Sequence, residues 1–361
     1  MNKNLKLSVV CLYLYCLVVS DALKLFRPGM ELVAVRPVLD SSQVGALDHH
    51  LAAEILGHLP EGFTPSGKKK SKKKVGKIRD IPKQIIEFQQ SIDLGLSKSD
   101  VVLDTREGLL DGTSGKMLAT VEELMEIARK QGGCYAIFDD GSAPWKISTL
   151  SENTGKPASL CPPLEGTGNP TMVLSGFTMH RIVGEEVNPA TDTAAKLSAL
   201  KLFKGAAVLD TCCGLGYTAI SAAKAVGADG KVFTIELDEA SIEMCVSNPH
   251  SRQLFDGTLP IDVLQGNSCD LIHHFKEGVF DAIIHDPPAR AICETDLYSE
   301  KFYSQLRSRL KPDNGQLFHY IGSPSSTESG RLYSGVRSRL AAAGFVDIRK
   351  FPEAFGIVAR A

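Results

Sequence analysis

Apolar runs and amphipathic stretches follow one another regularly from Thr191 to the end of the chain. Short apolar runs predict buried strands at 206–209, 231–236, 261–267, 280–285 and 316–321. Amphipathic stretches predict helices at 192–201, 219–226, 239–246, 299–310 and 331–343. Two further runs predict a terminal β-hairpin at 346–351 and 355–361. Strands joined by helices in this order predict an α/β domain, 181–361, with a doubly wound sheet of seven strands.

Residues 88–180 are predicted to form a small α+β domain of their own. Apolar runs predict strands at 99–103 and 134–138, and apolar periodicity predicts a helix at 120–131. Thr120 stands three residues before Glu123, which is the spacing of a capping box at a helix N-terminus.

The end of this small domain is rich in turn formers. Residues 151–169 contain many Gly and Pro residues and are expected to be a loop. The stretch 171–181 then leads into the larger domain. His180 and Arg181 are expected either near the mouth of a ligand site or as a structural pair at the surface.

Residues 23–87 are predicted to be a poorly structured linker, apart from one short helix at 49–59. Six lysines lie within the seven residues Lys68–Lys74. A block of like charges stays solvated and repels itself, so a flexible basic linker is the favoured interpretation. A weak contact with nucleic acid through Lys68–Lys74, or a nuclear signal, is the alternative.

Residues 1–22 have the pattern of a targeting segment. Lys3 and Lys6 precede an apolar run at 7–20, and small residues follow it. A transmembrane helix needs about 20 apolar residues, so a cleaved secretory signal is predicted, with a retained anchor as the alternative. This predicts entry into the secretory route, towards an organelle such as a plastid, with a cytoplasmic location as the alternative. No stable membrane partner is expected after processing.

Composition and charge are those of an ordinary globular protein of 361 residues, with 43% hydrophobic and 23% charged residues. The formal net charge of −2 excludes a global attraction to nucleic acid or to anionic membranes. The nine cysteines are odd in number and include no C-x-x-C pair, so neither a disulfide framework nor a metal cluster is expected.

The candidate chemistry begins after the first strand of the larger domain. The segment Asp210-Thr-Cys-Cys-Gly214-Leu-Gly216 follows a strand and precedes a helix. Glycine lets the backbone approach a ligand, and a helix N-terminus offers free N–H groups. No glycine stands three residues after Gly216, which excludes the dinucleotide pattern G-x-G-x-x-G. The segment instead resembles the first motif of class I S-adenosylmethionine (SAM) methyltransferases, with Cys212 in place of the first glycine.

The next two strands end in residues suited to a nucleoside. Glu236 lies 26 positions after Asp210, where a carboxylate can accept two hydrogen bonds from ribose hydroxyls. Asn267 follows the third strand, where SAM enzymes commonly contact the adenine. The carboxyl ends of parallel strands lie along one edge. The resemblance therefore places SAM against Asp210, Thr211, Cys212, Cys213, Gly214, Gly216, Tyr217, Glu236, Leu237, Asn267 and Ser268.

The fourth strand leads into Asp286-Pro287-Pro288, directly after His285. This resembles the Asn/Asp-Pro-Pro-aromatic motif of methyltransferases that act on exocyclic or amide nitrogens. Proline fixes φ and lacks an N–H, so a rigid carbonyl beside Asp286 can orient the target nitrogen. Ala289 replaces the aromatic residue, so the usual stacking surface for a base is missing. These four residues are the candidate catalytic residues, with His285 as a candidate general base.

Four further runs are similar to a family of predicted SAM-dependent methyltransferases best known from archaea. They are Ser175–Arg181, Asn248–Ser251, Leu297–Tyr303 and Phe318–Gly322. The resemblance covers roughly residues 88–361 and implies a SAM site and methyl transfer. It leaves the acceptor open among RNA, protein and a small amine.

Two other classes of protein share the fold. An aminopropyltransferase would use decarboxylated SAM and a polyamine, since an acidic group after the fourth strand suits a cationic amine. The other class is a non-catalytic binding protein, against which Asp210, Gly214, Gly216, Glu236 and Asp286 argue. The product's mass would separate the two enzymes, and failure to bind SAM analogues would favour the binding protein.

Overall fold

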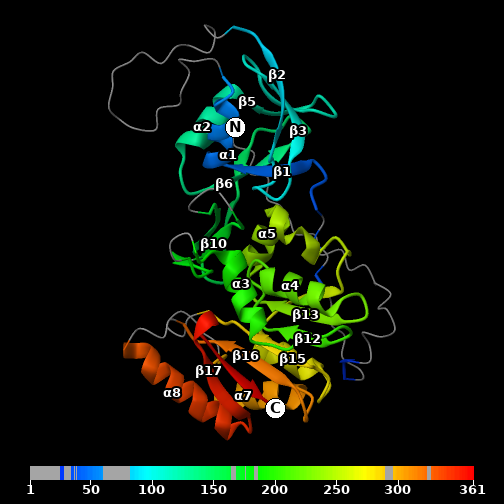
Figure 1. Cartoon of the computed structure of the whole chain (residues 1–361), viewed down its shortest axis with the longest axis vertical. Helices are drawn as coiled ribbons and strands as arrows, with labels where there is room; N and C mark the ends of the chain where they lie inside the picture. Colours follow the sequence, from blue (N-terminus) through cyan, green and yellow to red (C-terminus); the bar gives the residue numbers. More distant parts are fainter. Residues whose placement is uncertain are drawn as a thin grey trace.

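The computed structural model describes residues 25–27, 34, 35, 37, 39–59, 82–163, 168–174, 176–182, 186–288, 296–322 and 327–361. A strand-rich N-terminal part lies at one end of an elongated molecule, and a large sheet with its helices lies at the other (Figure 1).

The large sheet has seven strands in the order β14-β13-β12-β15-β16-β18-β17. In chain order they are β12 (Ala207–Asp210), β13 (Lys231–Glu236), β14 (Ile261–Gln265), β15 (Ala282–His285), β16 (Gln316–Tyr320), β17 (Val346–Phe351) and β18 (Gly356–Arg360). The first five run parallel, and β18 runs antiparallel to its neighbours β16 and β17. The predicted doubly wound α/β sheet of seven strands, with its terminal hairpin, is confirmed.

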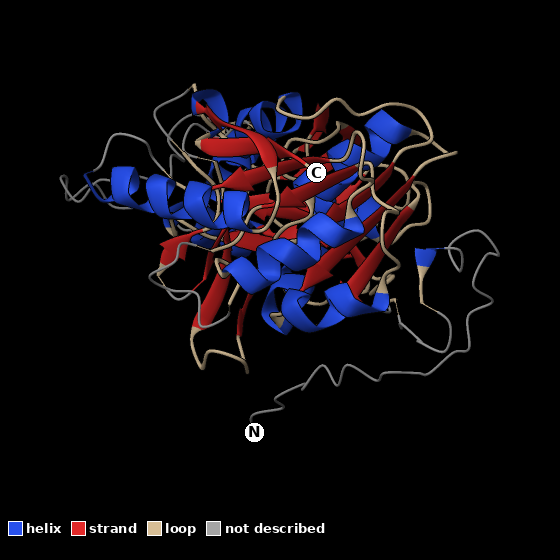
Figure 2. Cartoon of the chain, turned by 90° about the horizontal axis from the view of Figure 1, so that it is seen from below, coloured by secondary structure: helices blue, strands red, loops and turns tan. Residues whose placement is uncertain are grey.

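Helices cover both faces of this sheet (Figure 2). They are α3 (Pro189–Ser198), α4 (Tyr217–Val226), α5 (Glu239–Ser247), α6 (Ser268–Leu271), α7 (Glu300–Arg309) and α8 (Thr327–Ala342). Successive strand residues point to opposite faces, so β12 places Val208 in the core beneath α4 and α5 and Leu209 in the core beneath α7 and α8. Both faces are buried, which is why these strands are continuous apolar runs rather than alternating ones.

The N-terminal part is built from three small antiparallel sheets, β1-β6-β7, β2-β3-β4-β5 and β11-β10-β9-β8. Its elements are β1 (Gln43–Asp48), α1 (His49–Leu56), β2 (Ile85–Gln90), β3 (Ser99–Asp104), β4 (Gly108–Asp111), β5 (Met117–Thr120), α2 (Val121–Arg129), β6 (Cys134–Phe138), β7 (Trp145–Lys146), β8 (Ser148–Leu150), β9 (Pro157–Cys161), β10 (Thr171–Leu174) and β11 (Phe177–Thr178). The predicted capping box of Thr120 and Glu123 is present at the start of α2.

Two expectations for this region are wrong. The assumed linker 23–87 contains β1, α1 and part of β2, and the assumed loop 151–169 contains β9. Strand β1 pairs with β6, and β9 pairs with both β8 and β10, so long-range ladders stabilise these short segments. Such partners cannot be identified from local periodicity. The predicted signal segment 1–22 and the run Lys68–Lys74 lie outside the described residues.

Hydrogen bonds fasten the N-terminal part to the sheet domain near α5. Ser151 donates to Asp238 at 2.7 Å, and Gln43 donates to the Ser247 carbonyl at 3.0 Å. His250 Nε2 donates to the carbonyl of Leu94 at 3.0 Å. Among the described residues, no helix is long and apolar enough to cross a membrane.

Candidate functional site

The glycine turn after β12 depends on two residues with positive φ. Gly214 has φ of 55° and Gly216 has φ of 76°, a region that other residues adopt only with strain. A Cβ on Gly216 would lie 2.3 Å from Leu254, and one on Gly214 would lie 2.6 Å from the sulfur of Met179. The turn is therefore packed on one side by Leu254 and on the other by the segment after β11.

The buried carboxylate of Asp210 and the half-buried carboxylate of Glu236 hold the turn in place. Asp210 accepts from Thr218 at 2.8 Å and Thr234 at 3.2 Å, which joins β12 to α4 and to β13. Glu236 accepts from the backbone N–H of Gly214 at 2.8 Å and of Asp238 at 2.9 Å. Burial raises the pKa of each carboxyl group to about 7. Asp210 is thus a buried support of the turn, whereas Glu236 is half-buried at the end of β13, where a ribose could reach its carboxylate.

The residues predicted for the nucleoside lie together at the ends of β13 and β14. Leu237 is 39% exposed, which is high for a large apolar side chain. Its exposed apolar surface suits contact with a flat ring. Asn267 caps α6 by accepting from the N–H of Cys269 at 2.9 Å, so its amide group is fixed in direction. The Ser268 hydroxyl is buried and donates to the carbonyl of Thr211, which ties α6 to the glycine turn.

Three predicted cofactor contacts have side chains committed to the protein interior. Tyr217 is buried, donates to the carbonyl of Pro170 at 2.9 Å and accepts from Asn248. Cys213 is also buried, and its N–H donates to the Ile235 carbonyl at 2.8 Å. The Thr211 hydroxyl donates to His285, as described next. These three residues therefore support the glycine turn from within the protein.

The prediction that His285 is a general base is wrong, because both of its ring nitrogens are engaged. Nε2 donates to the carbonyl of Leu297 at 3.0 Å, so Nδ1 is the unprotonated nitrogen and accepts from Thr211 at 2.7 Å. Burial lowers the pKa of His285 to about 4. His319 lies against it and bonds the His285 carbonyl and Tyr303. His285 is a neutral structural residue behind the turn.

Asp286 lies in an ion chain that the sequence did not reveal. Its Oδ2 is 2.5 Å from Lys196 Nζ, and the same Nζ is 2.8 Å from Asp192. The second oxygen of Asp192 is 3.0 Å from Arg181 Nε. Burial raises the pKa of Asp286, and the positive charge of Lys196 opposes that rise. The chain of alternating charges links α3 to the loop after β15.

The sequence contains one local signal for this ion chain. Asp192 and Lys196 are four residues apart on the predicted helix, but such a pair is usually a solvated surface pair. Here both are buried, at 0% and 4% exposure. Arg181, predicted as either a site residue or a surface pair member, also stacks over the Phe355 ring at 4.0 Å. His180 instead packs on Tyr217 and bonds Thr171.

Pro287 and Pro288 form the start of the exit loop, as predicted. The Pro288 carbonyl accepts from the Tyr298 hydroxyl at 3.1 Å, which anchors this loop to the segment before α7. Ala289, which replaces the expected aromatic residue, lies outside the described residues.

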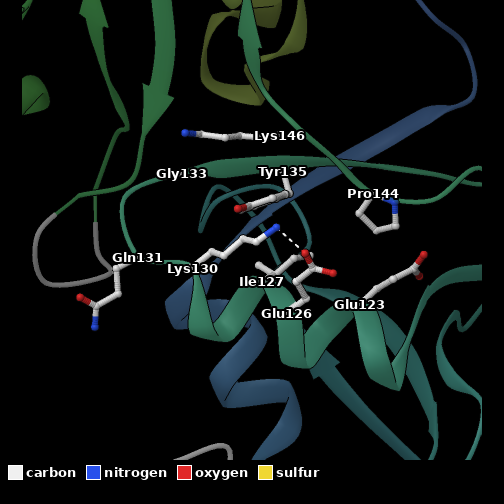
Figure 3. A pocket seen from close by; sticks show the side chains of 9 residues that line it. All are labelled: Glu123, Glu126, Ile127, Lys130, Gln131, Gly133, Tyr135, Pro144 and Lys146. Carbon is white, nitrogen blue, oxygen red and sulfur yellow. Dashed lines mark hydrogen bonds and ion pairs between the residues drawn. The ribbon is translucent and has the colours of Figure 1, made fainter. Parts of the chain in front are cut away.

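A separate pocket of about 450 Å³ lies in the N-terminal part, between α2 and β6 (Figure 3). Its lining includes Tyr135, Lys146 and the ion pair of Glu126 with Lys130. It contains none of the predicted site residues. No group of three or more His, Cys, Asp or Glu side chains in the described residues could hold a metal ion.

Comparison with known proteins agrees with this geometry. The family model described as a methyltransferase domain matches residues 202–327. An uncharacterized protein of Methanocaldococcus jannaschii is 38% identical over 287 residues, covering 77% of this chain and 93% of the relative. A 23S rRNA (uracil(1939)-C(5))-methyltransferase of Acinetobacter baumannii is 32% identical over 104 residues, covering 28% of this chain and 22% of that enzyme. A spermidine synthase of Thermotoga maritima superposes with a TM-score of 0.46 at 20% identity, over 59% of this chain and 71% of that one.

The sheet order, the glycine turn and the methyltransferase domain define a class I SAM-dependent methyltransferase with SAM as its cofactor. Within that class, the chain belongs to the same family as the uncharacterized Methanocaldococcus jannaschii protein.

The raised pKa of Glu236 predicts a pH dependence of SAM affinity. Only the ionised carboxylate accepts two ribose hydroxyl hydrogen bonds, and the ionised fraction falls about tenfold per pH unit below the pKa. With a pKa of about 7, affinity should rise from pH 5.5 to 7 and level off above pH 8. Calorimetry across this range measures it. A profile in Glu236→Gln as steep as that of the wild type would contradict the assignment.

Proposed function

We propose that the chain transfers the methyl group of SAM to a nitrogen atom held beside Asp286-Pro287-Pro288. The adenosine would lie across Glu236 and Asn267, and the methionine part would follow the Gly214 turn. The observation that carries the proposal is the register of β12, β13 and β15. Asp210 pairs with Thr234 on one side and Ile284 on the other. The three strands therefore end close together, and the loops that follow them begin side by side at one edge of the sheet.

The chemistry requires little beyond orientation. The nitrogen lone pair attacks the methyl carbon, the carbon–sulfur bond breaks, and its electron pair remains on sulfur to give S-adenosylhomocysteine. An N–H acceptor then releases a proton. Asp286 is the group placed to accept that proton, because burial makes its carboxylate more basic than usual. The two prolines fix the backbone beside Asp286, and this rigid segment would hold the nitrogen in line with the methyl group.

Binding of SAM at Glu236 is tested by calorimetry. Glu236→Ala removes the acceptor for two ribose hydroxyls, and each lost bond to a charged group costs about 1.5–3 kcal/mol. We expect SAM to bind at least about 10²-fold more weakly. Glu122→Ala removes an exposed carboxylate of α2 and serves as the control. Equal affinities in the two variants would place the ribose elsewhere.

The acceptor is identified by transfer of a labelled methyl group. Fractions of RNA, protein and polyamines are incubated with labelled SAM and the full chain. A parallel incubation of the same fractions contains decarboxylated SAM in place of SAM, and product mass then separates a methyl from an aminopropyl group. Transfer of an aminopropyl group would overturn the proposed reaction.

A further inference from the structure

We propose that Lys196 is a specificity-determining residue that occupies the cation position beside Asp286 and thereby selects an uncharged acceptor nitrogen. The acceptor class is then an amide or a heterocyclic N–H, and protonated primary amines are rejected. This inference rests on the proposed function, since it concerns the acceptor of that same methyl transfer.

The first support is the set of contacts that Lys196 makes. Its side chain is 5% exposed, and its Nζ is 2.5 Å from Asp286 and 2.8 Å from Asp192. The same Nζ lies 4.8 Å from the centre of the Tyr320 ring. Two carboxylates and an aromatic face are the groups that would hold an alkylammonium substrate. Lys196, a residue of the protein itself, already occupies the position that such a substrate cation would take.

The second support is the charge balance. The ion chain contains two cations, Arg181 and Lys196, and two anions, Asp192 and Asp286, so its charges cancel. Burial alone would lower the pKa of Lys196, but the charges of Asp286 and Asp192 raise it above its ordinary value. Lys196 is therefore a cation at neutral pH. A second ammonium brought to Asp286 would meet this charge without a new anion to compensate it.

An uncharged N–H acceptor fits the same arrangement. Within the described residues, the hydrogen bond of the Asp286 carboxylate is made by Oδ2, so Oδ1 is the oxygen to receive the acceptor N–H. The neutral nitrogen keeps the lone pair that the reaction needs, whereas an ammonium must first lose a proton. As the nitrogen–carbon bond forms, the nitrogen becomes positive and its proton passes to Asp286. Lys196 touches neither reacting atom and acts by keeping other cations out.

The experiment measures binding of spermidine, as a polyamine probe, to Lys196→Met at constant ionic strength. In this variant Arg181 still neutralises Asp192, and Asp286 alone lacks a partner. We expect spermidine to bind this variant at least about tenfold more tightly than the wild type. Calorimetry measures the affinity, and the rise in thermal midpoint on adding spermidine measures it independently. Lys201→Met, an exposed lysine just after α3, should behave like the wild type. The gain should disappear in the double variant Lys196→Met/Asp286→Asn.

Two results would overturn the inference. One is methyl transfer from labelled SAM to spermidine by the wild type. The other is a folded Lys196→Met with no gain in spermidine affinity; if that variant does not fold, Lys196→Gln is compared in the same way. SAM calorimetry on the wild type and on each variant separates the proposed function from the role of Lys196. Absence of SAM binding by the wild type defeats the proposed function, while intact SAM binding without amine gain defeats only the role of Lys196.

Discussion

Asp286→Ala is expected to lower turnover about 10²-fold while leaving SAM affinity nearly unchanged. The nitrogen becomes more positive as it attacks the methyl carbon, so a carboxylate beside it binds the transition state more tightly than the ground state. Asp286 does not hold the glycine turn, since that role belongs to Asp210 and Glu236. Loss of turnover without loss of cofactor binding is therefore the signature of its proposed role.

Asp286→Asn separates charge from orientation. The amide carbonyl can still accept a hydrogen bond from the acceptor N–H, but it cannot take the proton. We expect turnover between that of the wild type and that of Asp286→Ala. Asp313→Ala, an exposed carboxylate of the same domain, is the control. The measurement is transfer of labelled methyl to the acceptor found by the fraction screen. Wild-type turnover in Asp286→Ala would defeat the assignment.

The second large effect concerns stability. Asp192→Ala should lower the free energy of unfolding by about 3–5 kcal/mol, because it leaves buried cations without their shared anion. Asp192 is fully buried, and its two oxygens contact Arg181 at 3.0 Å and Lys196 at 2.8 Å. Urea unfolding followed by circular dichroism measures the loss.

An exposed ion pair supplies the matched control. Asp139 contacts Lys116 at 2.8 Å, with side chains 27% and 53% exposed. Asp139→Ala should cost no more than about 1 kcal/mol, since water screens such pairs. Similar losses in Asp139→Ala and Asp192→Ala would show that the buried chain contributes no more than a surface contact.

Local patterns predicted several strands of both parts of the protein closely. The strand predicted at 231–236 coincides with β13, and those predicted at 134–138 and 346–351 coincide with β6 and β17. The glycine turn was found because its positive φ values require Gly214 and Gly216. Each of these features depends on residues close together in the sequence, which is the range over which periodicity and turn chemistry act.

By itself, the sequence determined the order of strands and helices, the turn residues and the chemical types at the strand ends. Tertiary structure decided how those side chains are used. By placing α3 beside the end of β15, it brought Lys196 to Asp286, which lies 90 positions further along the chain. Asp192 and Arg181 complete the ion chain behind Lys196. It also turned His285 from a candidate base into a neutral buried residue, because Thr211 and the Leu297 carbonyl engage both ring nitrogens. The physical reason is that burial and long-range partners set the charge and freedom of a polar group, and neither is encoded within one local segment.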